Sequence, residues 1–334
     1  MATVNVSSEP AEECDVKNQA LYMFYAAAMI VIFILALPLN ASVLHLFVFK
    51  LKFWKSNTNN VFLFNLVLAD VLLLFCLPIK ARDFITGERR SSNDALCKAM
   101  LFVLFLNRGA SIAFLTVTTI DRYFKVVHPG QNAALKVLKK SRHISIIIWL
   151  LLLPLTIPTM LKTFECCNSH KTDGENDTLV EDAVESMREV VFFSQILIPF
   201  IILAYCTVRI INRLRRKTIG VRTKLRRAVF LVTIVMVVFS LCFLPCTVAR
   251  MVLLIVRLRL FDEAVQENAA VVFDGLMILS YIDCLLDPLV YCFCSSKFKA
   301  LYLSTYCSCF LKRCPVQTNS SLGNPTQPER NKVI

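Results

Sequence analysis

Long apolar stretches alternate with short polar segments along most of the chain, and this alternation predicts an all-α membrane protein with seven spanning helices. The spans are expected near residues 20–49, 60–81, 97–124, 143–164, 190–211, 228–256 and 270–294. Each approaches or exceeds the ~20 apolar residues that a helix needs to cross a bilayer. The bundle is therefore expected to occupy residues 20–294, after a polar extracellular segment at 1–19.

The last forty residues divide into two parts. Aromatic and leucine residues recur at three- and four-residue spacing beside lysines after residue 295, which predicts a short amphipathic helix on the inner membrane surface. Residues 295–314 combine this eighth helix with three candidate palmitoylation sites, Cys307, Cys309 and Cys314. The polar remainder, residues 315–334, is expected to be a disordered cytoplasmic tail.

Charge is distributed unevenly between the two sides of the predicted bundle. The chain carries a net charge of +13 and is 56% apolar, which is too apolar for an ordinary soluble domain. Nine basic residues and no acid occupy residues 209–227, whereas acids gather at 9–15 and 173–189. Because basic loops stay in the cytoplasm, the amino terminus is expected outside the plasma membrane. The same clustering argues for membrane lipids and against a nucleic-acid partner.

Four of the fourteen cysteines fall in segments that are expected to be extracellular, where disulfides persist: Cys14, Cys97, Cys166 and Cys167. A bond between the two adjacent cysteines would be strained. Cys97 and Cys14 are therefore each expected to pair with one of Cys166 and Cys167, in either order. Asn5 and Asn176 begin glycosylation sequons on the same side.

Several polar residues interrupt the spans. Arg108 lies in the third span, roughly 21 Å along a helix from Arg122, so it falls within the depth of the bilayer. Asn40, Asp70 and Asp283 lie in the first, second and seventh spans. Ionisable residues at such depth are functional candidates. Arg108 could bind a ligand or could pair internally, for instance with Asp274 or Asp283.

Taken together, the motifs of the spans resemble the rhodopsin-like G-protein-coupled receptors over about residues 20–310. The matching positions are Asn40, residues 66–70, Cys97, residues 121–123, Trp149, Pro199, residues 242–245 and residues 287–291. The resemblance implies a heterotrimeric G protein and arrestin as partners. It also implies an activation machinery made of Asp121, Arg122, Tyr123, Phe243, Pro245, Asp287, Pro288 and Tyr291. An allosteric sodium ion at Asp70, within a network of Asn40, Ser111 and Asp283, would be the sole cofactor.

Within that family, residues 107–108, 114–116 and 121–129 resemble the hydroxycarboxylic acid receptors and the neighbouring receptors for oxidised arachidonic acid products. The resemblance implies that Arg108 binds the carboxylate of the ligand. The other expected ligand-binding residues are Lys80, Asn107, Arg250 and Tyr281. Residues 241–246 and 249–250 are most similar to the hydroxyeicosatetraenoic acid branch, and signalling through an inhibitory G protein that lowers cyclic AMP is implied.

The apolar residues near Arg108 favour an oxidised fatty acid as the ligand, with small hydroxycarboxylic acids as the alternative. The expected tail-binding residues are Leu101, Leu104, Phe105, Ile112, Met251 and Leu254. The chain also departs from the wider family: Phe243 replaces the usual tryptophan, Thr207 replaces a tyrosine, and no acid in 222–227 can pair with Arg122.

Other functional classes fit the sequence less well. A transporter or channel also needs polar groups at mid-membrane depth, but seven spans do not divide into paired repeats. A retinal-binding opsin needs a lysine in the seventh span, and an amine receptor needs a carboxylate where Leu104 stands. Metal-spaced His/Cys clusters, phosphate-binding loops and nucleophile motifs are missing, so the chain is not expected to be an enzyme.

Overall fold

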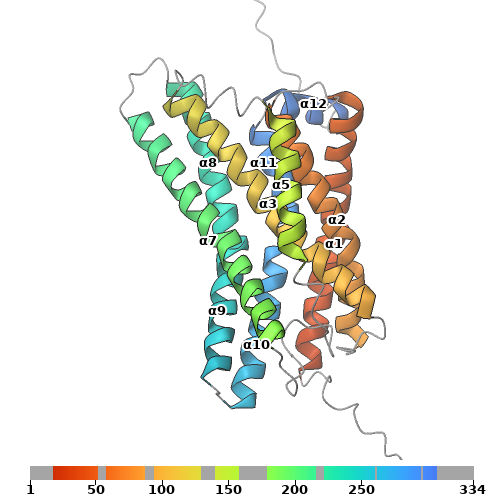
Figure 1. The fold of residues 1–334 in the computed structure, drawn as a ribbon. Coiled ribbons are helices and arrows are strands. Elements are labelled where there is room, and N and C mark those ends of the chain that lie inside the picture. Colours follow the sequence, from red (N-terminus) through yellow and green to blue (C-terminus); the bar gives the residue numbers. More distant parts are fainter. Residues whose placement is uncertain are drawn as a thin grey trace, which may run out of the picture.

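The computed structural model describes residues 18–51, 58–86, 94–128, 140–157, 179–215, 222–259, 262–294 and 296–306. All the regular elements of this part of the chain are helices (Figure 1). Several sequence predictions concern residues outside these ranges: Asn5, Cys14, Cys166, Cys167, Asn176, Cys307, Cys309, Cys314 and the tail at 315–334. They stay predictions.

The helices form a single bundle of seven spans and an eighth helix across one end (Figure 1). The first five spans are α1 (Gln19–His45) with its π-helical continuation η1 (Leu46–Lys50), α2 (Thr58–Thr86), α3 (Asp94–Val127), α5 (Ser141–Thr156) and α7 (Leu179–Arg215). The sixth comprises α8 (Arg222–Cys242) and α9 (Leu244–Leu258), and the seventh comprises α10 (Glu263–Ser280) and α11 (Asp283–Cys294). The eighth helix is α12 (Ser296–Tyr306). The predicted fold class is confirmed.

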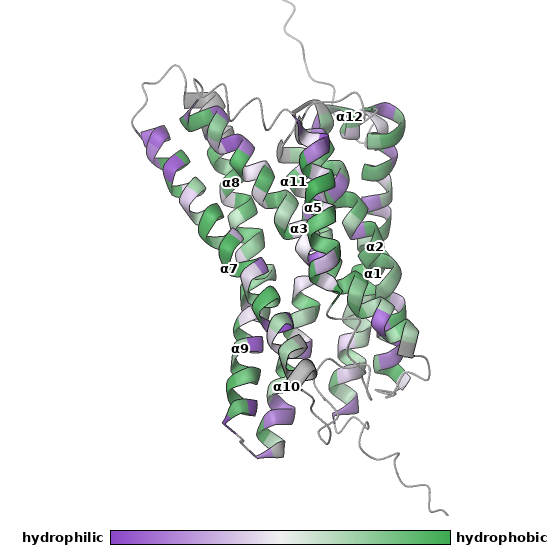
Figure 2. Ribbon diagram, viewed as in Figure 1, coloured by the Kyte–Doolittle hydropathy of each residue, from purple (hydrophilic) through white to green (hydrophobic). Residues whose placement is uncertain are grey.

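Length and hydropathy match a membrane bundle. Six of the spans are long and apolar enough to cross a bilayer, and the described part of α5 is a shorter apolar helix. Figure 2 shows apolar residues along the middle of the bundle and hydrophilic residues towards the two ends. Large apolar side chains such as Phe75 and Ile201 are exposed on the outer face, which suits contact with lipid.

The fifth span is longer than the hydropathy pattern predicted. We expected it over 190–211, whereas α7 begins at Leu179 and ends at Arg215. The additional residues at its start belong to the acidic segment that was expected outside the bundle. A helix can continue past the membrane surface as long as its backbone hydrogen bonds still form, and hydropathy does not reveal such an extension. This extension places Glu189 inside the bundle, with only 12% of its side chain exposed.

α3 lies at the centre of the bundle and packs against α2, α5, α7 and α8. The first and last spans close the bundle, since α1 packs against both α10 and α11. A Cβ atom at Gly275 would lie 2.4 Å from the Tyr25 hydroxyl oxygen, so the glycine permits this close approach. The side-chain amide of Asn40 donates to the carbonyl oxygen of Cys284 at 2.8 Å, which fixes the register of α1 on α11.

Two spans are interrupted near the same depth. The chain bends at Phe243 between α8 and α9, just before Pro245. Proline has no backbone N–H, so it removes a helical hydrogen bond and kinks the span. In the seventh span, Tyr281 and Ile282 form a tight turn through backbone bonds to Ile278 and Leu279.

α12 is fastened to the end of α1. The buried Phe298 ring stacks on Phe47 at 5.2 Å between centroids. The Tyr302 hydroxyl lies 3.2 Å from the Ser42 hydroxyl, and the Tyr306 hydroxyl lies 2.9 Å from Nδ1 of His45. These contacts define one end of the bundle, called the α12 end below.

Candidate functional site

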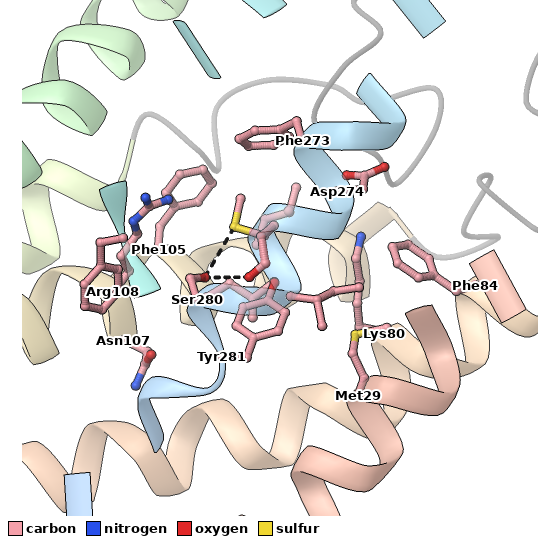
Figure 3. A pocket seen from close by; sticks show the side chains of 15 residues that line it. Met29, Lys80, Phe84, Phe105, Asn107, Arg108, Phe273, Asp274, Ser280 and Tyr281 are labelled. Carbon is pink, nitrogen blue, oxygen red and sulfur yellow. Dashed lines mark hydrogen bonds between the residues drawn. The ribbon is translucent and has the colours of Figure 1, made fainter. Parts of the chain in front are cut away.

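A cavity of about 710 Å³ opens towards the end of the bundle opposite α12. Side chains from α1, α2, α3, α10 and the turns after α8 and α10 line it (Figure 3). The lining residues are Met29, Lys80, Phe84, Leu101, Leu104, Phe105, Asn107, Arg108, Phe243, Phe273, Asp274, Met277, Ile278, Ser280 and Tyr281. The main cavity is therefore largely apolar, with a small number of convergent polar groups, as is usual for small-molecule sites.

Arg108 is one of the polar residues that line the main cavity. It is only 6% exposed, and its guanidinium lies 4.3 Å from the centre of the Phe192 ring and 5.9 Å from that of Phe243. Its Nη1 atom is 3.7 Å from Sγ of Cys246. Among the described residues, Nε and Nη2 have no hydrogen-bond partner and the guanidinium makes no ion pair. Two of its nitrogens can thus donate hydrogen bonds to an incoming anion.

The internal partners considered for Arg108 are engaged elsewhere or lie in another network. Asp274 accepts a hydrogen bond from the Tyr22 hydroxyl at 2.9 Å. It also lies on the same side of the cavity as Lys80 in Figure 3, where the two are close enough to interact electrostatically. Asp283 lies in a separate network, where it interacts electrostatically with Asp70. The alternative of an internally paired Arg108 therefore finds no support among the described residues.

Four of the five predicted ligand-binding residues surround the main cavity: Lys80, Asn107, Arg108 and Tyr281. The Lys80 ammonium lies 4.9 Å from the centre of the Phe84 ring. The Asn107 side-chain nitrogen has no hydrogen-bond partner among the described residues. Tyr281 lies at the turn between α10 and α11, which directs it towards the cavity (Figure 3).

The fifth predicted residue, Arg250, does not line the main cavity. It lies at a smaller cavity of about 240 Å³, with Phe105, Arg188, Glu189, Phe192 and Phe273. There its Nε donates to Oε2 of Glu189 at 3.1 Å, and its Nη2 donates to Oε1 of the same carboxylate. Sequence reasoning missed this ion pair because Glu189 ends an acidic stretch that was expected to lie outside the bundle.

The apolar part of the lining was predicted in part. Leu101, Leu104 and Phe105 of α3 line the main cavity as expected. Ile112, Met251 and Leu254 do not, and their place is taken by residues of α10: Phe273, Met277 and Ile278. The spacing of four between Phe273 and Met277, beside the polar Asp274, is the sequence signal that could have indicated this face of α10.

A second polar cluster lies deeper in the bundle. Asp70, Asp283 and Asp287 are 1%, 4% and 0% exposed, and the Tyr291 hydroxyl donates to Oδ2 of Asp70 at 3.4 Å. Ser111 Oγ and Asp283 Oδ1 have no hydrogen-bond partner among the described residues. Isolated carboxylates are costly in a medium of low dielectric, so three of them in one buried cluster need compensation.

The predicted activation residues of α3 lie at the α12 end. Asp121 forms an ion pair with Lys125 at 2.5 Å, one helical turn further along. The Tyr123 hydroxyl lies 3.2 Å from Nε2 of His128, and its ring lies 6.0 Å from that of Tyr205. Tyr205 was missed, because sequence reasoning noted only that Thr207 stands where a tyrosine is usual. Cys97, at the other end of α3, is disulfide-bonded, and its partner lies outside the described residues.

Comparison with known proteins identifies the fold family. The family described as 7 transmembrane receptor (rhodopsin family) matches residues 39–291 of this chain. The chain belongs to that family. It is 34% identical to the 12-(S)-hydroxy-5,8,10,14-eicosatetraenoic acid receptor of Mus musculus over 275 residues, which covers 80% of this chain and 84% of the relative. It is 32% identical to hydroxycarboxylic acid receptor 2 of Homo sapiens over 291 residues, covering 84% and 77%.

Membership of the rhodopsin family confirms the predicted receptor class. The receptor is a multi-pass membrane protein and not an enzyme, and its partners are a G protein and a small-molecule ligand. Mus musculus hydroxycarboxylic acid receptor 1 aligns over 90% of the chain at 30% identity. The predicted cluster of hydroxycarboxylic acid and hydroxyeicosatetraenoic acid receptors is thus confirmed as the neighbourhood of this sequence.

Arg108 and Arg250 should respond oppositely to replacement by methionine, which removes the charge but keeps much of the volume. Arg108→Met removes an uncompensated buried cation, so it should stabilise the ligand-free receptor by about 1–3 kcal/mol. Arg250→Met takes a partner from Glu189 and should destabilise the receptor by about 1–3 kcal/mol. Thermal unfolding of the purified receptors in detergent would measure both changes. Equal destabilisation by the two variants would mean that Arg108 is already compensated.

Proposed function

We propose that this receptor binds a ligand with a single carboxylate, that Arg108 is the anchor, and that the preferred ligand is an oxidised fatty acid. The observation that carries the proposal is the buried guanidinium of Arg108, which faces a largely apolar cavity without an ion-pair partner among the described residues. A guanidinium is always charged and matches a carboxylate through two parallel hydrogen bonds. At low dielectric, such a pair gains more than it would in water.

The lining of the main cavity supports a ligand with a hydrocarbon tail. Apolar side chains make up most of its lining, as in sites that bury the apolar part of a ligand. Phe105, Phe273 and Met277 offer apolar surface next to Arg108, and an acid of three or four carbons would leave most of this surface unfilled. The name of the mouse relative, a receptor for a hydroxylated eicosanoid acid, agrees with this ligand class.

Small hydroxycarboxylic acids are the second candidate. Two of the relatives are named hydroxycarboxylic acid receptors, and the polar groups of Asn107, Arg108, Ser280 and Tyr281 all line the main cavity. Such a cluster could bind the carboxylate and the hydroxyl of a short acid. A panel that runs from short hydroxy acids to oxidised long-chain fatty acids, read as G-protein activation, would separate the two candidates.

Loss of the Arg108 charge should weaken activation strongly. Arg108→Ala should lower the potency of the best carboxylate agonist by roughly thirty- to several-thousand-fold, since truncating one partner of a buried charge pair costs about 2–5 kcal/mol. Arg108→Lys should restore little of this potency, because an ammonium group does not reproduce the two parallel hydrogen bonds of a guanidinium. The measurement is a concentration–response curve at matched surface expression. A normal response of Arg108→Ala, or a methyl ester as potent as the free acid, would refute the anchor.

We further propose that the cavity end faces the outside of the plasma membrane and that the α12 end faces the cytoplasm. Basic residues lie where helices end at the α12 end: Lys50 in the last turn of η1, Lys125 in that of α3, and Arg213 and Arg215 in that of α7. This distribution follows the positive-inside rule. Arg122 then lies at the surface that a G protein and arrestin would contact.

The contact between Arg108 and Phe243 suggests how binding reaches that surface. Phe243 lies at the bend between α8 and α9, with its ring beneath the guanidinium. A carboxylate that draws Arg108 away from this ring would change the packing at the bend. α8 could then swing at its α12 end and expose Arg122 together with the basic segment 209–227.

The proposed coupling is to an inhibitory G protein. An agonist acid should therefore lower cyclic AMP in transfected cells, and pertussis toxin should abolish the response. Cells that express Arg108→Ala at the same surface level are the control for effects of the acid that bypass the receptor. A rise in cyclic AMP, or a response that survives the toxin, would contradict this assignment.

We also propose that a sodium ion binds beside Asp70. Oxygen donors suit a hard cation, and Asp70, Asp283 and Ser111 supply carboxylate and hydroxyl oxygens in one buried cluster. A ligand that binds only the folded state stabilises it. Sodium chloride should therefore raise the unfolding temperature of the ligand-free receptor above that in equal potassium chloride, and Asp70→Asn should abolish the difference. An equal effect of both salts on the unmodified receptor would exclude a selective site.

A further inference from the structure

A second arginine lies next to the ligand cavity but is occupied by an acid of the receptor itself. Arg250 is 4% exposed, and two of its nitrogens bind the two carboxylate oxygens of Glu189. Glu189 comes from α7 and Arg250 from α9, so this ion pair joins the fifth and sixth spans. Arg188 also approaches the Glu189 carboxylate, at 3.5 Å. The third nitrogen of Arg250, Nη1, has no hydrogen-bond partner among the described residues.

The smaller cavity around this ion pair is adjacent to the main one. Phe105 and Phe273 line both cavities. Phe192, which lines the smaller cavity, is the ring beneath Arg108 at 4.3 Å, and Phe273 lies beneath Arg250 at 5.5 Å. The two guanidiniums therefore flank one group of aromatic rings. A ligand bound at Arg108 therefore lies next to the residues that line the smaller cavity.

We propose that Arg250 and the smaller cavity form a second anion-binding subsite, which Glu189 masks, so that the receptor accepts ligands with one carboxylate and rejects those with two. This inference rests on the proposed role of Arg108 as the carboxylate anchor. Glu189 acts as a built-in substitute for the second carboxylate, since it already fills the fork of Arg250. It is therefore a specificity-determining residue of the pocket.

Two physical effects produce the rejection. The second carboxylate of a ligand must displace an intramolecular bidentate ion pair, which costs the strong charge-assisted hydrogen bonds of that pair. It must also share the smaller cavity with the Glu189 carboxylate, whose like charge repels it at low dielectric. Arg188, 3.5 Å from Glu189, offsets part of this repulsion. Repulsive elements of this kind are a common source of specificity. Glu189→Gln removes the charge at nearly constant shape and leaves Arg250 available.

The test uses pairs of acids that share one tail and differ in one carboxylate near the head. Dodecylsuccinate and pentadecanoate form a long pair, and succinate and butyrate form a short pair in case the receptor prefers small acids. The unmodified receptor should respond at least about tenfold more sensitively to the monocarboxylate of the active pair. In Glu189→Gln, the ratio of dicarboxylate to monocarboxylate potency should rise by about ten- to a hundredfold.

Two control variants and one binding measurement accompany this test. Adding Arg250→Gln to Glu189→Gln should abolish the gain, whereas Glu267→Gln, which makes the same charge change on α10 outside both cavities, should not produce it. The dicarboxylate should also raise the unfolding temperature of purified Glu189→Gln more than that of the unmodified receptor.

The proposal is overturned if the unmodified receptor responds equally to both members of the active pair, a result that needs no variant to fold. It is also overturned if the selectivity ratio stays constant in Glu189→Gln, or if the gain persists without Arg250. Failure of the underlying function is distinguishable, because then the monocarboxylate response would not depend on Arg108 in any of these backgrounds.

Discussion

A charged side chain without a counter-ion is costly inside a membrane protein, and Arg108, which lines the main cavity, has no counter-ion among the described residues. Arg108 is held on the central helix by its own backbone and by soft contacts with Phe192, Phe243 and Cys246. Aromatic faces and a sulfur atom partly solvate a cation but do not neutralise it. The free-energy cost of burying the Arg108 charge would be partly recovered if an anion bound to it. Stability of the ligand-free state and affinity for the ligand are therefore opposed at one residue.

The contrast with Arg250 shows that the partner decides the role, and not the residue type. Both arginines are almost fully buried, both lie over a phenylalanine ring, and they are separated by residues common to two cavities. Arg250 has a carboxylate in its fork, while Arg108 has none among the described residues. A buried pair is hard to open because each partner would lose its compensation. Among the described residues, the Arg108 guanidinium is therefore left open to an anion, whereas Arg250 links α7 and α9 through Glu189.

The fold was predictable from sequence because the bilayer imposes a strong and simple constraint on it. A spanning segment must be apolar over a fixed length, so the spans and the polar residues within them are visible in the chain. Arg108, Lys80 and Tyr281 were found in this way or through family resemblance. The helices are apolar on nearly all sides, however, so periodicity says little about which face points inward. Leu101 and Phe105 lie near Arg108 on the same helix and were placed correctly, while Met251 and Phe273 depended on helix rotation and were not.

The bend at Phe243 links the charge of Arg108 to the rest of the bundle. Pro245 removes one backbone hydrogen bond from the sixth span, near the depth at which Arg108 contacts Phe243. A tryptophan there could donate a hydrogen bond from its indole N–H, but a phenylalanine ring can meet the guanidinium only through its face. That attraction weakens when the charge is neutralised by a bound anion, because a paired cation interacts less with a ring. The packing at the bend is thus sensitive to the charge of Arg108, and through it to whether a carboxylate is present. Under the proposed function, an arginine and a phenylalanine at a proline bend would connect recognition in the pocket with the position of α8.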